Sequence, residues 1–89
     1  MDEKDRAKLI RTGNECFRNG EYKEAARIFI KTRYSDGLIR MGDFYYYEKQ
    51  DVAAALKFYK AANYQPGVAV LIEKIVPVIR KWLKEDEQV

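Results

Sequence analysis

Apolar residues recur along this chain at the three- and four-residue spacing of α-helices, and the pattern divides the chain into five helical segments. The first covers about residues 4–18 and follows Asp2, whose carboxylate can cap a helix. It should end at Asn19 and Gly20, which both tolerate the left-handed backbone common just beyond a helix. A second helix begins at Tyr22, and because the intervening turn is short we expect the two helices to lie antiparallel.

The third and fourth segments repeat this order. Ser35 can cap a third helix that reaches about residue 49, and Asp51 can cap a fourth that ends near Asn63 and Tyr64. The aromatic run at residues 44–47 continues the helical period of the third segment, so it does not indicate a strand.

The last segment, about residues 66–86, is apolar along one broad face and precedes a polar tail at residues 87–89. Pro66 suits the first turn of this helix. Pro77 lies inside it, where it removes one backbone hydrogen bond and clashes with the carbonyl of Glu73, so we expect a kink or break there. The residues of the apolar face are Val68, Leu71, Ile72, Ile75, Ile79, Trp82 and Leu83.

Residues 9–31 are duplicated at residues 38–60. The matched pairs, each 29 positions apart, include Leu9 and Leu38, Gly13 and Gly42, Ala25 and Ala54, and Phe29 and Phe58. A constant offset of this size is typical of stacked supersecondary units, which bury their apolar faces on one another because one unit alone cannot. We therefore expect function to lie on a surface rather than in a catalytic pocket.

These residues resemble tetratricopeptide repeats and the related Sel-like helical repeats, in which a small residue on one helix meets an alanine and an aromatic residue on the next. The resemblance implies an all-α fold, namely a short right-handed α-solenoid of two helix-turn-helix repeats plus a C-terminal capping helix. The repeats would cover about residues 5–34 and 35–64, within a single domain over residues 1–86. The offset of 29 is shorter than the 34 residues of the family, and two repeats are fewer than the ~3 that a stable solenoid usually needs. Self-association through the last helix is therefore expected.

The resemblance also implies a groove for an extended or helical peptide, formed by the first helix of each unit. Transferred to this chain, the groove residues are Ile10, Arg11, Asn14, Phe17, Arg18, Ile39, Arg40, Asp43, Tyr46 and Tyr47, with Lys74 on the last helix. Tyrosines beside arginines favour recognition of an acidic peptide. We expect Tyr45 to pack against the fourth and fifth helices, whereas the sequence leaves open whether Tyr46 and Tyr47 are packed or exposed. A second interface, for a homodimer or a larger assembly, would consist of Ile79, Trp82 and Leu83.

Composition narrows the classes of function. The 89 residues are 47% hydrophobic and 35% charged, as in a soluble globular domain, and no apolar stretch approaches a membrane span. The start of the chain lacks the apolar core of a signal peptide, so a cytoplasmic location is expected. The chain contains no histidine, and the lone Cys16 is most simply a packing residue. We therefore expect no enzyme activity, no cofactor and no metal site.

The sequence thus predicts a non-catalytic protein–protein interaction module, an adaptor or scaffold that binds a peptide or a partner helix through its concave face. The alternative is a nucleic-acid-binding helical repeat protein, which is indicated by a net charge of +3, a pI near 9.0 and arginines beside aromatic residues. Acidic residues interleave with the basic ones, so the sequence contains no uniform basic stripe.

Overall fold

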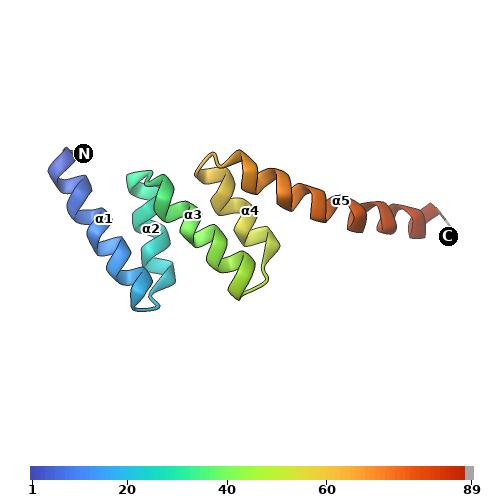
Figure 1. The fold of residues 1–89 in the computed structure, drawn as a ribbon, viewed down its shortest axis with the longest axis horizontal. Helices are drawn as coiled ribbons and strands as arrows, with labels where there is room; N and C mark the ends of the chain where they lie inside the picture. Colours follow the sequence, from blue (N-terminus) through green and yellow to red (C-terminus); the bar gives the residue numbers. More distant parts are fainter. Residues whose placement is uncertain (88–89) are drawn as a thin grey trace.

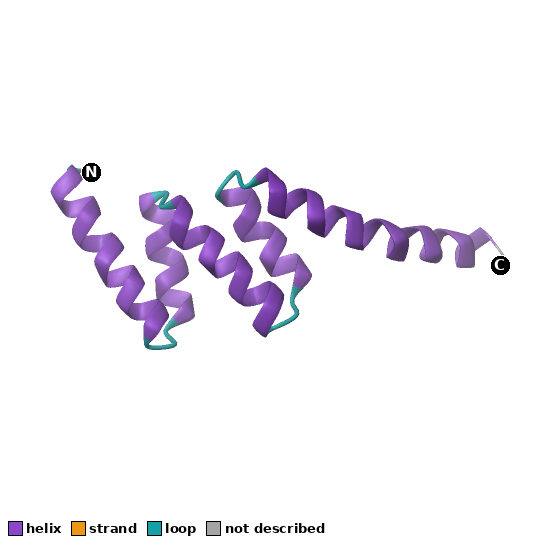
Figure 2. Cartoon of the chain, viewed as in Figure 1, coloured by secondary structure: helices purple, strands orange, loops and turns teal. Residues whose placement is uncertain are grey.

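The computed structural model describes the backbone of residues 1–87 and the side chains of residues 1–84. Over this range the protein is all-α, as predicted, and no strand is present (Figure 2). The elements are α1 (Glu3–Arg18), α2 (Tyr22–Thr32), α3 (Ser35–Asp43), a π-helical turn η1 (Phe44–Glu48), α4 (Val52–Ala61) and α5 (Gln65–Glu87). None of these helices is long and apolar enough to cross a membrane.

The helices pack in chain order. Figure 1 shows α1 and α2 as one antiparallel hairpin, and α3 with α4 as a second hairpin beside it. The first half of α5 packs against α4, and its second half projects away from the other helices (Figure 1). The molecule is therefore elongated, with extents of 58, 23 and 18 Å.

A large aromatic side chain wedges each hairpin against the next helix. Phe29 of α2 is fully buried between α1 and α3, where Gly13 and Gly37 allow the close approach. A Cβ atom at either glycine would lie 2.8 or 2.6 Å from a ring carbon of Phe29, which is closer than packed atoms tolerate. In the second hairpin the matching residues are Tyr59 of α4, with Gly42 of α3 and Gly67 of α5.

This packing corrects the register that the sequence predicted for the second hairpin. Phe29 corresponds to Tyr59, 30 positions later, and the predicted counterpart Phe58 is wrong. The predicted match of Ala25 with Ala54 is wrong for the same reason. The spacing of 30 also relates the fully buried Ala25 to Ala55, and the left-handed residues Gly20 to Gln50 and Arg33 to Asn63.

The extra residue is accommodated at the end of the third helix. The sequence predicted one helix to about residue 49, but α3 ends at Asp43 and continues as the π-helical turn η1. In this turn the Lys49 N–H donates to the Phe44 carbonyl five residues earlier, at 3.3 Å. A π-helical turn holds one more residue than an α-helical turn, which shifts everything after it by one position.

The helix ends agree with the sequence in part. The carboxylate of Asp51 caps α4 as predicted, accepting from the Ala54 N–H at 3.1 Å. Asp2 is the N-cap residue of α1, but its side chain accepts no capping hydrogen bond. The prediction that Ser35 caps the third helix is wrong, because Ser35 is the first residue of α3 and Tyr34 occupies the cap position.

Of the kink or break that the sequence predicted at Pro77, the break does not occur, because α5 is continuous through this residue. Figure 1 shows a gentle bend in the middle of α5, as the missing backbone hydrogen bond of a proline allows. The helix reaches Glu87, one residue into the predicted polar tail, and residues 88–89 of that tail lie outside the described residues.

Candidate functional site

The exposed side chain of Tyr47 borders three adjacent hollows on the surface, which we call the Tyr47 surface. The first, about 170 Å³, lies between η1, α4 and α5. The second, about 490 Å³, lies between α1 and η1, and the third, about 340 Å³, lies between η1 and α5. Of the predicted groove residues, these hollows are lined by Phe17, Arg40, Asp43, Tyr46, Tyr47 and Lys74.

The π-helical turn distributes its tyrosines between the core and this surface. Tyr45 turns inward and stacks on Phe58 of α4 with ring centroids 5.4 Å apart, which confirms its predicted packing against the fourth helix. Tyr46 is half-buried, and the Lys74 ammonium lies 5.0 Å from its ring centroid. Tyr47 is 70% exposed, and its ring stands perpendicular to that of Tyr46. The sequence left open whether these two tyrosines are packed or exposed, and the structure shows that Tyr46 is partly packed whereas Tyr47 is exposed.

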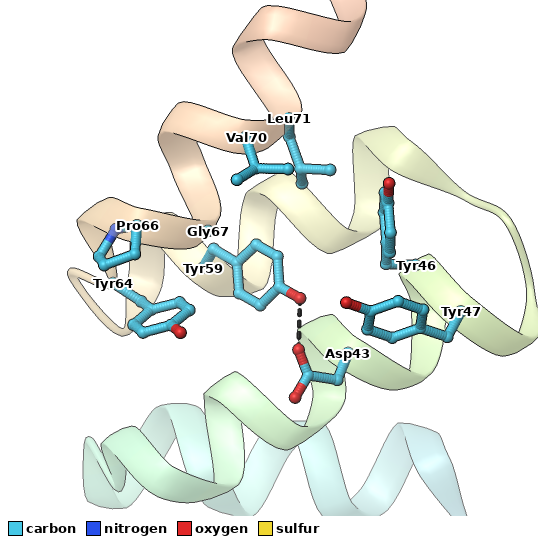
Figure 3. A pocket seen from close by; sticks show the side chains of 9 residues that line it. All are labelled: Asp43, Tyr46, Tyr47, Tyr59, Tyr64, Pro66, Gly67, Val70 and Leu71. Carbon is cyan, nitrogen blue, oxygen red and sulfur yellow. Dashed lines mark hydrogen bonds between the residues drawn. The ribbon is translucent and has the colours of Figure 1, made fainter.

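A hydrogen bond between α3 and α4 forms the floor of the first hollow (Figure 3). The Tyr59 hydroxyl donates to an oxygen of the Asp43 carboxylate at 2.5 Å. Tyr59 is only 4% exposed. Burial raises the pKa of Tyr59 above its usual value, and the bond to Asp43 raises it further, so the hydroxyl stays protonated and keeps donating.

The second hollow carries a cation on an aromatic ring. The Arg40 guanidinium of α3 lies 5.8 Å from the centroid of the Phe17 ring of α1. The Phe17 ring also meets Tyr22 and Phe44 edge to face, at centroid distances of 5.5 and 6.0 Å. The arginine is thus held at the junction of the two hairpins with its charge exposed to solvent.

The other predicted groove residues do not line these three hollows. Ile10 and Asn14 are half-buried on α1, whereas Arg11 and Arg18 are exposed. Ile39 packs against the core between α3, α4 and α5. The buried Oδ1 atom of Asn14 has no hydrogen-bond partner among the described residues.

Reasoning from the sequence missed the α4 and α5 side of the first hollow. The missed lining residues are Tyr59, Tyr64, Pro66, Gly67, Val70 and Leu71. A signal for them exists, because Tyr34 and Gly37 recur as Tyr64 and Gly67 at the spacing of 30. A repeat of 29 residues does not align these pairs.

The predicted second interface lies on the part of α5 that projects from the other helices. Ile79, Trp82 and Leu83 are 44%, 62% and 58% exposed. Large apolar side chains exposed this far, in one continuous stretch of helix, are typical of surfaces that pack against another molecule.

The remaining chemistry of the described residues is limited. Cys16 is buried in the core, as predicted for a packing residue, and burial raises the pKa of its thiol. Within the described part of the chain no three histidine, cysteine, aspartate or glutamate side chains are grouped as they would be around a metal ion.

A comparison with known proteins relates the chain to an uncharacterized protein of Treponema pallidum (strain Nichols). The two are 41% identical over 80 residues, which cover 90% of this chain and 76% of the treponemal protein. The chain belongs to the family of that protein. No family model and no solved structure matches the chain, so the resemblance to tetratricopeptide repeats stays a prediction.

Proposed function

We propose that this protein is a protein-interaction module, an adaptor or scaffold that binds a peptide or a partner helix on the Tyr47 surface. In this proposal the two hairpins are tetratricopeptide-like repeats of a short solenoid, and α5 is its capping helix. The observation that carries the proposal is the position of Tyr47, which is 70% exposed where three hollows meet. A tyrosine so placed contributes large apolar contact area and a polar hydroxyl at little cost in side-chain entropy.

Charged groups beside Tyr47 indicate the chemistry of the partner. Arg40 and Lys74 flank the tyrosine on neighbouring helices, which favours an acidic segment.

The test compares the wild-type chain with a Tyr47→Ala, Arg40→Glu variant as baits in a nuclease-treated lysate. We expect a protein that only the wild type retains, and its affinity for the purified chain is then measured by calorimetry. Lys57→Glu, an exposed charge reversal on α4, is the matched control and should bind like the wild type.

Two results would count against this proposal. Equal retention by both baits would place the interface away from the Tyr47 surface. Retention of nucleic acid from untreated lysate, with an affinity that falls steeply as salt is raised, would favour the nucleic-acid-binding alternative.

The exposed face of α5 supports a second interaction, a homodimer in which α5 pairs antiparallel with α5 of a second copy. Ile72, Ile75, Ile79 and Trp82 follow one another at spacings of three, four and three residues, the pattern of a two-helix seam. An antiparallel pair centred near Pro77 would place Glu73 of one copy close to Arg80 of the other. Sedimentation equilibrium of the wild type and a Trp82→Lys variant tests this. A wild type that stays monomeric at high concentration would exclude the dimer.

A further inference from the structure

We propose that the first hollow of the Tyr47 surface is a binding site for an organic cation, an alkylammonium group such as the end of a lysine side chain. We call this site the tyrosine cage, and its members are Tyr46, Tyr47, Tyr59, Tyr64 and Asp43. The inference goes beyond the proposed function and depends on it only for the source of the cation, which would be a side chain of the partner.

Four tyrosine side chains line the tyrosine cage, and their rings are inclined to one another rather than stacked. Figure 3 shows Tyr46 and Tyr47 on one side of the Tyr59 ring and Tyr64 on the other. The planes of Tyr46 and Tyr47 are perpendicular with centroids 4.8 Å apart, and those of Tyr59 and Tyr64 are inclined by 57° at 5.5 Å. The exposed Tyr47 ring and the half-buried rings of Tyr46 and Tyr64 can turn negative faces toward a cation in the hollow. The Tyr59 ring is packed between Gly42 and Gly67, so this residue contributes only its hydroxyl group.

The charge of the tyrosine cage selects a cation over an anion. One oxygen of the Asp43 carboxylate accepts the Tyr59 hydroxyl, and the half-buried carboxylate forms no ion pair with any lysine or arginine among residues 1–84. A partly desolvated carboxylate without a counter-ion favours a cationic ligand, since the ligand restores the electrostatic stabilisation that burial removed. Lys74 lines the neighbouring third hollow and does not line this one.

The size of the tyrosine cage limits the ligand. Its volume is about 170 Å³, similar to the ~150 Å³ cavity that admits a benzene molecule. The terminal methylenes and ammonium of a lysine, or a trimethylammonium group, fit this volume. Val70 and Leu71 of α5 form an apolar wall that suits the methylene carbons (Figure 3).

The experiment titrates the full chain with small cations and follows the tyrosine ring signals by NMR. The probes are choline and a blocked lysine amide, each paired with a neutral analogue of the same shape, 3,3-dimethylbutan-1-ol and a blocked norleucine amide. We expect saturable shifts of the Tyr46, Tyr47 and Tyr59 rings with a cationic probe and at least tenfold weaker binding of its neutral analogue. Choline binding more tightly than the lysine amide would identify a free alkylammonium compound as the source, and the reverse order would identify a protein side chain.

Two variants locate the site. Asp43→Asn keeps an acceptor for Tyr59 and removes the charge, so it should weaken cation binding at least tenfold. Glu48→Gln removes one negative charge from the same turn, outside the tyrosine cage, and should leave binding unchanged. Equal binding of the neutral analogues, or no ring shift at millimolar probe, would overturn the proposal. Either result would leave the proposed function standing if a partner still discriminates the Tyr47→Ala, Arg40→Glu bait.

Discussion

Replacing Tyr59 with phenylalanine isolates the hydrogen bond that joins α4 to α3. The ring stays in its place between Gly42 and Gly67, and only the hydroxyl that donates to Asp43 is lost. A hydrogen bond to a charged acceptor contributes about 1.5–3 kcal/mol net. Because Asp43 is half-buried and water can reach its carboxylate, we expect the lower end, about 1.5 kcal/mol. In a domain of this size that loss lowers the unfolding midpoint by about 6–12 °C.

The same variant carries a pH signature. Tyr59 has a folded-state pKa raised above the usual 10.0, so its contribution to stability is complete below pH 10.0 and is lost as the pH rises further, because the unfolded chain releases the proton first. The stability difference between wild type and Tyr59→Phe should therefore shrink above pH 10.0. Urea denaturation followed by circular dichroism, at neutral pH and at several alkaline values, measures both effects.

Tyr34→Phe is the matched control, since Tyr34 is half-buried and its hydroxyl forms no hydrogen bond with the described residues. It should change the free energy of unfolding by less than about 0.5 kcal/mol. The reasoning is refuted if Tyr59→Phe is as stable as the wild type at neutral pH, or if the difference between them does not depend on alkaline pH.

Four further substitutions probe the register of the second hairpin, the cap of α4 and the proline inside α5. Ala55→Val should lower the free energy of unfolding by about 1–3 kcal/mol, because it overpacks a fully buried position. Ala54→Val, at a partly exposed position, should lower it by less than about 1 kcal/mol. If urea denaturation shows the reverse order, the register predicted from the sequence is right. Asp51→Ala removes the cap of α4 and should lower the free energy of unfolding by about 1 kcal/mol in the same assay. An unchanged midpoint would mean that the hydrogen bond from the Ala54 N–H contributes nothing to stability. Pro77→Ala restores one backbone donor inside α5 and removes the helix-propensity penalty of proline, about 3 kcal/mol. Amide exchange in the second half of α5 should therefore slow. Faster exchange would contradict the continuous helix.

The tyrosine cage shows where sequence reasoning reaches its limit. Tyr46 and Tyr47 were identified from the sequence because the resemblance to tetratricopeptide repeats places them on the first helix of the second unit, which lines the groove in that family. Tyr59 and Tyr64 were missed because periodicity places a residue on a face of its own helix and carries no information on what that face meets. Their meeting with Asp43 depends on the packing of α3, α4 and α5, which the local sequence does not encode.

The sequence by itself determined the helices, most of their ends and the duplication, because the spacing of apolar residues, left-handed turn residues and an aspartate cap act over a few neighbouring positions. The tertiary structure alone decided the register of the second hairpin. The π-helical turn η1 adds one residue between the two helices of this hairpin. As a result Tyr59, and not Phe58, packs between Gly42 of α3 and Gly67 of α5. Close packing between helices discriminates neighbouring residues of the same chemical type, which the hydrophobic pattern cannot do.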